Sequence, residues 1–299
     1  MAEALLDGRL DIKIGDSRDL LREMPGGSVN CCVTSPPYFG LRDYGHDGQI
    51  GLEPTPDEFV AALVEVFREV RRVLAGDGTV WLNLGDSYGA KKQLGGIPWR
   101  VAFALQADGW YLRQDIIWHK PNPMPECVRD RCTKAHEYVF LLSKSARYWY
   151  DAEAVAEPGT NRPPGNTKPT KGGRALIEGD GHFRTAGALH DIGARETRNR
   201  RSVWSITSQP YDGAHFATMP PKLAETCILA GCPKGGVVLD PFGGAGTTAI
   251  AALRHGRRAI LCELNPEYAD LAEQRIRDEW RVPSRPDVVD FGPLYGGIA

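Results

Sequence analysis

The sequence predicts an α/β fold whose sheet is mostly parallel and is covered by helices on both faces. Two observations support this prediction. Short apolar runs recur along the chain, and helical patterns lie between several of them, which is the alternation typical of parallel sheets. The runs expected to form strands are LDIKIGD (10–16), VNCCVTS (29–35), GTVWLNLGD (78–86), YLRQDIIWHK (111–120), EYVFLLSKS (137–145), GGVVLDPF (235–242) and RRAILCEL (257–264).

The clearest helical pattern begins at Thr55. Thr55 suits an N-cap, Pro56 suits the first helical position, and Glu58 completes a capping box. Apolar residues then recur at the three- and four-residue spacing of one helix face, and Gly76 suits the end of the helix. The residues expected on the buried face are Phe59, Leu63, Val66 and Val70.

Composition places the chain among ordinary globular proteins. The 299 residues are 42% hydrophobic and 25% charged, with a formal net charge of −2. There is no apolar run of the roughly 20 residues that cross a bilayer, and the N-terminus lacks the basic-then-apolar pattern of a signal peptide. We therefore expect a cytoplasmic protein that does not bind membranes. The seven cysteines are an odd number spread over a long chain, which indicates reduced thiols.

The segment CCVTSPPYFG (31–40) ends one of the expected strands with an unusual corner. The run Val29–Val33 is short and apolar, as in a buried parallel strand. Proline has no N–H for a sheet ladder, so the strand should stop near Ser35. Pro36 and Pro37 stiffen the chain there and present Tyr38 at the carboxyl edge of the sheet, where ligands of open α/β sheets bind.

A second functional pattern reads strand, glycine loop, helix, strand over residues 237–263. The loop DPFGGAGTT lets the backbone approach a ligand and opens a helix whose amides face the site. Asp240 ends one strand and Glu263 ends the next, where an acid can bind ribose hydroxyls. The G-x-G-x-x-G fingerprint of dinucleotide enzymes is absent. Asn265 and Pro266 then suit the start of another helix.

Residues 157–201 differ from the rest of the chain. They are rich in glycine, proline, threonine and arginine, with nine basic and five acidic residues, so the segment carries a net charge of +4. A loop of this length inside an α/β domain is typically functional or disordered. The clustered basic residues favour contact with the phosphates of a nucleic acid, and a flexible solvated insertion is the alternative.

Together, TSPPY and DPFGGAGTT with the downstream Glu263 resemble the catalytic motif and cofactor loop of DNA methyltransferases that methylate amino groups. The catalytic motif comes first, which is similar to the circularly permuted beta group of that family. Further similar pieces are IKIGDS, WHKPNPMPE, RCTKAHEYVFLLSKS and HFATMPPKLAE. The resemblance implies a Rossmann-like methyltransferase domain with a catalytic half (10–156), a target-recognition insertion (157–201), a cofactor-binding half (202–280) and a tail (281–299).

The resemblance also implies the cofactor, S-adenosyl-L-methionine, and the residues that bind it. Strand-end acids hold the adenosine in this family, and the glycine loop lines the methionine end. The expected cofactor-binding residues are Asp16, Phe216, Thr218, Asp240, Pro241, Phe242, Gly243, Gly244, Gly246, Thr247 and Glu263. No metal ion is expected.

The motif Ser35, Pro36, Pro37 and Tyr38 is expected to be catalytic. An exocyclic amine on a base is a poor nucleophile because its lone pair is delocalised. Hydrogen bonds from the amine to the Ser35 hydroxyl and the Pro36 carbonyl would favour a more tetrahedral nitrogen. Tyr38 would stack on the base. Because a duplex buries the amine, the base must be flipped out, at a cost of a few kcal/mol.

The fold does not decide which base is methylated, because cytosine N4 and adenine N6 have similar geometry. In the family, serine before Pro-Pro-Tyr is typical of cytosine-N4 enzymes and aspartate of adenine enzymes in this permuted group. Ser35 can accept a hydrogen bond from the amine and donate one toward cytosine N3. Adenine N1 is an acceptor too, so cytosine N4 is favoured and adenine N6 stays the alternative.

The expected partner is double-stranded DNA, with Arg198, Arg200 and Arg201 as phosphate contacts; a homodimer and a cognate restriction enzyme are compatible with the resemblance. Three other interpretations compete with this one. The first is a non-catalytic DNA-binding protein of the same fold, and the second is methylation of RNA or of protein amides. The third is a zinc site formed by His119, Cys127, Cys132 and His136. Roles in the core or in loops are the preferred interpretation of these four residues.

Overall fold

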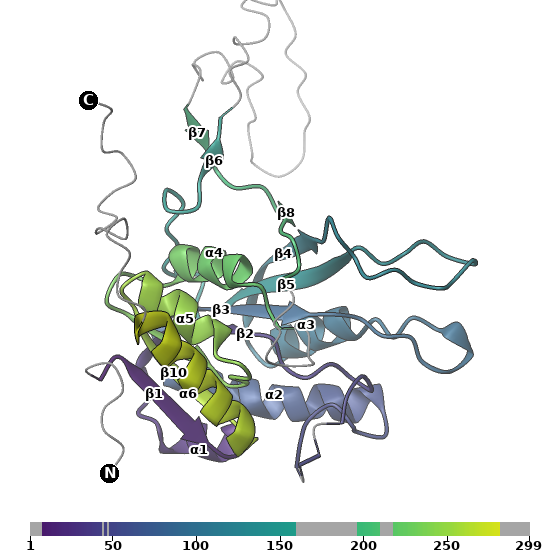
Figure 1. Ribbon diagram of the computed structural model, residues 1–299, viewed down its shortest axis with the longest axis horizontal. Coiled ribbons are helices and arrows are strands. Elements are labelled where there is room, and N and C mark those ends of the chain that lie inside the picture. Colours follow the sequence, from purple (N-terminus) through teal and green to yellow (C-terminus); the bar gives the residue numbers. More distant parts are fainter. Residues whose placement is uncertain (1–7, 44, 47, 160–195, 210–217, 282–299) are drawn as a thin grey trace, which may run out of the picture. The chain divides into compact units, whose positions relative to one another are not determined.

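The computed structural model describes residues 8–43, 45–46, 48–159, 196–209 and 218–281. Its centre is an eight-stranded sheet with the order β1-β10-β9-β2-β3-β5-β4-β8 (Figure 1). The strands are β1 (Leu10–Ile14), β2 (Val29–Thr34), β3 (Leu74–Leu84), β4 (Tyr111–His119), β5 (His136–Ser143), β8 (Val203–Ser205), β9 (Val237–Asp240) and β10 (Arg258–Glu263). All seven expected strands are therefore present, and β8 is an addition.

The sheet is parallel from β1 through β10, β9 and β2 to β3. The sequence prediction of a mostly parallel sheet is thus confirmed, with one exception. Strand β5 is antiparallel to both β3 and β4, and β8 then adds to β4 in parallel. β2 lies beside β9 although some two hundred residues separate them in the chain. The segment that begins at Ser35, after β2, and the glycine loop after β9 therefore leave the sheet at neighbouring positions.

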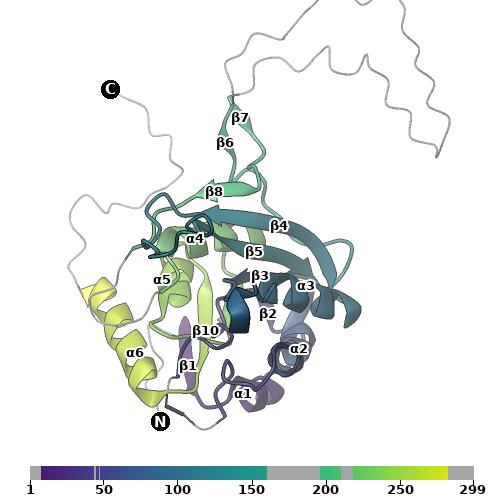
Figure 2. The same ribbon diagram turned by 90° about the vertical axis from the view of Figure 1, so that its right-hand side faces the viewer.

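Helices cover both faces of the sheet. On one face α1 (Ser17–Glu23), α2 (Pro56–Val73) and α3 (Ile97–Ala107) pack in succession, and on the other α4 (Pro221–Gly231), α5 (Thr247–Arg254) and α6 (Pro266–Arg281) do so (Figure 2). A short 3-10 helix, η1 (Ala90–Lys92), lies in the connection from β3 to α3. Among the described residues, no helix is long and apolar enough to cross a membrane.

Helix α2 has the predicted start and the predicted buried face, but a different end. The Thr55 side chain accepts from the Glu58 N–H, and the Glu58 side chain accepts from the Thr55 N–H. Its four expected apolar residues are fully buried. The prediction that Gly76 ends the helix is wrong: α2 ends at Val73, and Leu74 already begins β3. The sequence gives no sign of this boundary, because the helix passes into the strand without an intervening turn.

By its contacts the chain divides into two units, residues 1–151 with 202–299 and residues 152–201. The predicted insertion, residues 157–201, falls within the second unit, of which 152–159 and 196–201 are described. There, β6 (Glu157–Pro158) pairs with β7 (Thr197–Arg198) in an antiparallel ribbon. The roles given to the two halves and the insertion stay predictions, and the predicted tail lies outside the described residues beyond residue 281.

Candidate active site

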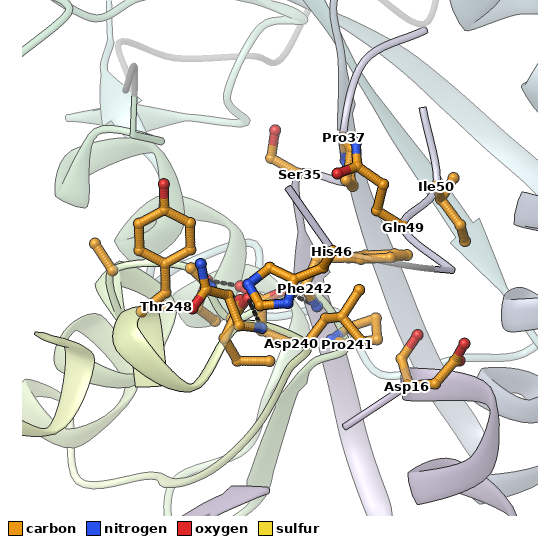
Figure 3. Close-up of a pocket in the computed structure, with 18 of the residues that line it drawn as sticks. Asp16, Ser35, Pro37, His46, Gln49, Ile50, Asp240, Pro241, Phe242 and Thr248 are labelled. Carbon is orange, nitrogen blue, oxygen red and sulfur yellow. Dashed lines mark hydrogen bonds between the residues drawn. The ribbon is translucent and has the colours of Figure 1, made fainter. Parts of the chain in front are cut away.

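A pocket opens where four neighbouring parallel strands end. β1, β10, β9 and β2 run in the same direction, so their carboxyl ends meet at one edge of the sheet. Figure 3 shows side chains from these strand ends around one cavity. Of the expected site residues, those lining it are Asp16, Ser35, Pro37, Thr218, Asp240, Pro241, Phe242, Gly243, Gly244, Thr247 and Glu263. Most of the residues predicted for the site therefore line one pocket, and they make up just under half of its lining.

Asp240 is the most deeply buried carboxyl group of this pocket, with 4% of its surface exposed. It accepts hydrogen bonds from the hydroxyls of Thr34 (2.6 Å) and Thr248 (2.8 Å) and from the Phe242 N–H (3.1 Å). Burial raises the pKa of Asp240 to about 7, although these three bonds oppose the shift. Asp240 therefore ties the strand that precedes Ser35 to the glycine loop.

Glu263 is held by backbone amides at the end of β10. It accepts from the Gly244 N–H (2.7 Å) and from the Asn265 N–H (2.9 Å). Burial raises its pKa, and these amide bonds oppose the shift. Gly244 has a φ of +48°, in the region that favours glycine, which lets its N–H turn toward the carboxylate. A carboxylate has about four lone-pair sites, so these amides leave acceptor capacity for a ligand in the pocket.

Asp16 follows β1 and serves as the N-cap of α1. Its carboxylate accepts from the Arg18 N–H at 2.8 Å and pairs with the Arg18 guanidinium at 2.5 Å. This guanidinium lowers the pKa of Asp16, more strongly than burial raises it. The cap and the ion pair fix the carboxylate at the mouth of the pocket.

Three expected residues are not brought to this pocket by the structure. Pro36 and Gly246 do not line it. Gly246 has a φ of +75°, and a Cβ there would lie 3.0 Å from Cβ of Ala272, so this glycine allows α5 and α6 to approach closely. Tyr38 lines a different cavity, described below. Phe216 lies outside the described residues.

The sequence analysis missed residues of the loop that follows the Ser-Pro-Pro-Tyr motif. His46, Gln49 and Ile50 all line the pocket (Figure 3). The loop is closed by a hydrogen bond from the Gly40 N–H to the Gly51 carbonyl (2.8 Å). It carries no periodic pattern, so only its position directly after the motif could have indicated a role. Leu264, Asn265 and Tyr268, after β10, are among the other lining residues that the sequence did not indicate.

A second pocket lies on the other side of the motif and contains Tyr38. Its lining also includes Gly85, Lys120, Met124, Lys134 and Glu137. The Tyr38 hydroxyl donates to Glu137 Oε2 (2.7 Å) and accepts a long bond from Ser35 Oγ (3.4 Å). Ser35 lines the first pocket and Tyr38 the second, so this hydrogen bond links a residue of one lining to a residue of the other.

Tyr38 is fixed at both its hydroxyl and its ring. Glu137 also accepts from Asn83 Nδ2 (3.1 Å) and forms an ion pair with Lys120. A Cβ at Gly85 would lie 2.5 Å from Cε2 of Tyr38, so glycine at this position lets the backbone cover part of the ring. Burial raises the pKa of Tyr38 well above its usual value, and the Glu137 charge adds to this shift. The tyrosine therefore stays a neutral hydrogen-bond donor.

Some of the arginines predicted to contact phosphates pair with an acidic side chain of the same chain. Glu157 accepts from Arg198 Nε at 3.0 Å and from Arg201 Nε at 2.6 Å. Arg201 is exposed, and Arg198 and Arg200 are half-buried. Their contact with DNA stays a prediction.

Of the four residues with loosely zinc-like spacing, His119 and His136 are partners across the paired strands β4 and β5. His119 contacts the Ser205 hydroxyl through Nδ1 at 3.0 Å, and His136 packs edge-on against Tyr138. Cys127 and Cys132 are exposed free thiols. Over the described ranges there is no group of three or more His, Cys, Asp or Glu side chains placed to hold a metal ion.

Comparison with known proteins gives a consistent family. The family model described as DNA methylase, for N6 and N4 methyltransferases, matches residues 29–274. The chain is 44% identical to the Type II methyltransferase M.Cfr9I of Citrobacter freundii, over 89% of this chain and 87% of that protein. It is 43% identical to the Type II methyltransferase M.SmaI of Serratia marcescens, over 89% and 90% of the two chains.

Solved structures agree with the fold. TTHA0409 of Thermus thermophilus, described as a putative DNA modification methylase and complexed with S-adenosyl-L-methionine, has a TM-score of 0.60 and 27% identity over 91% of this chain and 97% of that one. The PvuII DNA methyltransferase, described as cytosine-N4-specific, has a TM-score of 0.66 at 22% identity over 90% of each chain. The match over most of the chain and the high identity to two methyltransferases show that this protein belongs to the N4/N6 family of S-adenosylmethionine-dependent DNA methyltransferases.

Proposed function

We propose that this protein transfers the methyl group of S-adenosylmethionine to the N4 amine of a flipped-out cytosine in double-stranded DNA. The observation that carries the proposal is the hydrogen bond between Ser35, which lines the first pocket, and Tyr38, which lines the second. The first pocket would take the cofactor and the second the base. The Ser35 hydroxyl would then lie between the methyl donor and the amine.

The chemistry of the first pocket fits S-adenosylmethionine. Glu263 and Asp16 offer carboxylate oxygens to the ribose hydroxyls and the adenine amine, and Ile50 and Phe242 offer apolar surface to the purine. The absence of side chains at Gly243 and Gly244 leaves room for a close approach of the ligand to the backbone. When bound, the cofactor supplies an electrophilic methyl group.

The second pocket suits a base lifted out of a duplex. Tyr38 presents an aromatic surface for stacking, which is worth about 1–3 kcal/mol per base. The Ser35 hydroxyl and the Pro36 carbonyl are the acceptors proposed for the two amine protons. They would hold the nitrogen in line for transfer, and such positioning is a large part of catalysis. The amine reacts directly, so no covalent enzyme intermediate is required.

Serine at position 35 favours cytosine over adenine as the target. A serine hydroxyl accepts one hydrogen bond and donates another, whereas an ionised aspartate only accepts. Ser35 can thus accept from the N4 amine and, by giving up its long hydrogen bond to Tyr38, donate to the adjacent N3 of cytosine. The description of the PvuII enzyme as cytosine-N4-specific agrees with this assignment, which its 22% identity does not establish.

The remaining parts of the proposal concern organisation and partners. The motif at 35–38 precedes the glycine loop at 240–247, which supports the circularly permuted beta-group order. The basic segment 157–201 is proposed as the target-recognition region. A cognate restriction enzyme is proposed because the relatives are named Type II methyltransferases. A homodimer stays a prediction. A bacterial cytoplasm, where chromosomal DNA lies, is the proposed site of action.

Nucleoside analysis tests the function directly. Purified protein, S-adenosylmethionine and unmethylated bacterial DNA are incubated, and the DNA is digested and separated by mass spectrometry. We expect N4-methylcytosine, and none when Ser35→Ala replaces the native protein. N6-methyladenine as the sole product would overturn the cytosine assignment, and an absence of any methylated base would overturn the proposed activity. Sequencing of the modified DNA would then give the target site.

A further inference from the structure

The connection between β4 and β5, residues 120–135, carries an unusually exposed apolar side chain. Met124 is 86% exposed, more than any other large hydrophobic residue in the described part of the chain. Single exposed apolar residues are common and need no function. Met124, however, lines the second pocket together with Tyr38, where the target base is proposed to bind.

The chain around Met124 is stiff. Prolines alternate with other residues at positions 121, 123 and 125, and each fixes its own φ and restricts the residue before it. Two residues before the methionine, Asn122 Nδ2 donates to the Ser208 carbonyl (3.1 Å), and the Ser208 N–H donates to Asn122 Oδ1 (3.0 Å). This pair of hydrogen bonds anchors the connection to the segment that follows β8.

The other side of Met124 is anchored as well. Glu126, two residues later, forms an ion pair with Arg131 and accepts from the Lys134 N–H. The connection is closed by a hydrogen bond from the Lys120 N–H to the Ala135 carbonyl (2.8 Å). Met124 is therefore presented to solvent by a segment fixed on both sides.

The connection that carries Met124 is itself basic. Residues 120–135 contain four basic and two acidic residues, a net charge of +2. A neighbouring loop joins them: Lys92 forms an ion pair with Asp130 (2.5 Å), and the Arg131 guanidinium lies 4.1 Å from the Tyr88 ring centroid. A DNA duplex combines negatively charged phosphates on its outside with an apolar stack of bases inside. A basic segment that presents an apolar side chain therefore suits the duplex beside the flipped base.

We propose that Met124 is a wedge that enters the duplex and fills the space left by the flipped base. Apolar side chains, methionine among them, insert between base steps in many DNA-bending proteins. Methionine is unbranched and polarisable, so it can pack against either neighbouring base pair. The fixed segment brings it there without an added ordering cost. This inference rests on the proposed function, because it requires that the target base leaves the stack.

The test compares methylation rates on two duplexes that contain the mapped target site. One duplex is fully paired, and in the other the target base faces an abasic position, so that less stacking and pairing has to be broken. For Met124→Ala we expect a roughly tenfold slower reaction on the paired duplex, since about 1.4 kcal/mol of lost stabilisation corresponds to a factor of ten. On the pre-opened duplex the loss should shrink to less than about twofold, because the flipped state no longer needs the wedge.

Two further variants sharpen the comparison. Met124→Leu keeps an apolar wedge and should recover most of the lost rate. Leu94→Ala, which removes an exposed apolar side chain from the neighbouring loop, should match the native protein on both duplexes. An equal loss for Met124→Ala on the paired and the pre-opened duplex would overturn the wedge. A native protein that methylates neither duplex would instead contradict the proposed function itself.

Discussion

The hydroxyl of Tyr38 lies 2.7 Å from Oε2 of Glu137, a bond that joins the segment after β2 to strand β5. The same carboxylate accepts from Asn83 Nδ2 and pairs with Lys120. Glu137 therefore collects three donors, one from the proposed catalytic motif, one from β3 and one directly after β4. The position of Tyr38 therefore depends on Glu137, a residue outside the proposed catalytic motif.

We predict that Glu137→Gln slows methylation by about ten- to a hundredfold, which corresponds to roughly 1.4–2.7 kcal/mol. Glutamine has one acceptor oxygen and no charge, so it cannot serve Tyr38, Asn83 and Lys120 together. Affinity for S-adenosylmethionine should be unchanged, because Glu137 does not line the first pocket. Single-turnover rates and calorimetric cofactor binding measure the two quantities separately.

Combining variants tests whether Glu137 acts through the tyrosine hydroxyl. If it does, the loss in Tyr38→Phe with Glu137→Gln should be clearly smaller than the sum of the single losses, expressed as free energies. Asp108→Asn serves as the control, since Asp108 pairs with Arg68 of α2 and lines neither pocket. Fully additive losses would assign Glu137 a role independent of Tyr38.

Asp240 gives a prediction on pH and stability. Its folded-state pKa is raised to about 7, and its unfolded value is near 3.8. Between these values the folded protein keeps a proton that the unfolded chain has lost, so stability falls as pH rises from about 4 to about 7. Below this window the contribution is fully present, and above it the slope from this group ends. The largest loss is about 4 kcal/mol, from about 1.4 kcal/mol per pKa unit.

Asp240→Asn isolates this contribution, because the amide is neutral and still accepts from Thr34 or Phe242. Urea unfolding of both proteins at several pH values gives the difference in their unfolding free energies. The native protein should lose stability relative to Asp240→Asn as the pH rises from about 4 to about 7, the window set by the two pKa values. Parallel curves over this range would show that Asp240 has an ordinary pKa in the folded state.

The sequence identified the strand ends of the site because apolar runs that end in Asp240 and Glu263 have a clear pattern. It could not give the antiparallel direction of β5, since an apolar run has no direction of its own. It also missed His46 and Ile50, which reach the first pocket from a loop that shows no periodicity. The partner of Tyr38 was equally hidden, because the 99 positions between Tyr38 and Glu137 carry no pairing signal.

For the cofactor we predict that Glu263→Gln weakens S-adenosylmethionine binding by at least about tenfold. Replacing a charged acceptor by a neutral one removes a charge-assisted bond to ribose, typically worth about 1.5–3 kcal/mol. The variant keeps one oxygen for the Gly244 or Asn265 N–H, so the loop should stay folded. Isothermal titration calorimetry measures the affinity, and unchanged binding would remove Glu263 from the cofactor site.

The last prediction concerns DNA and the arginines around Glu157. Replacing Arg198, Arg200 and Arg201 by alanine should weaken duplex binding and lower its salt dependence, because each phosphate contact contributes about 0.9 to the slope of log K against log salt. Cofactor affinity should stay the same. Arg22→Ala, Arg254→Ala and Arg277→Ala together remove the same charge from residues that pair with acids on the helices, and serve as the control. Fluorescence anisotropy between about 50 and 200 mM salt, concentrations at which phosphate contacts change affinity strongly, measures both effects. Equal slopes for the two triple variants would mean that net charge alone matters and that the DNA-binding surface lies elsewhere.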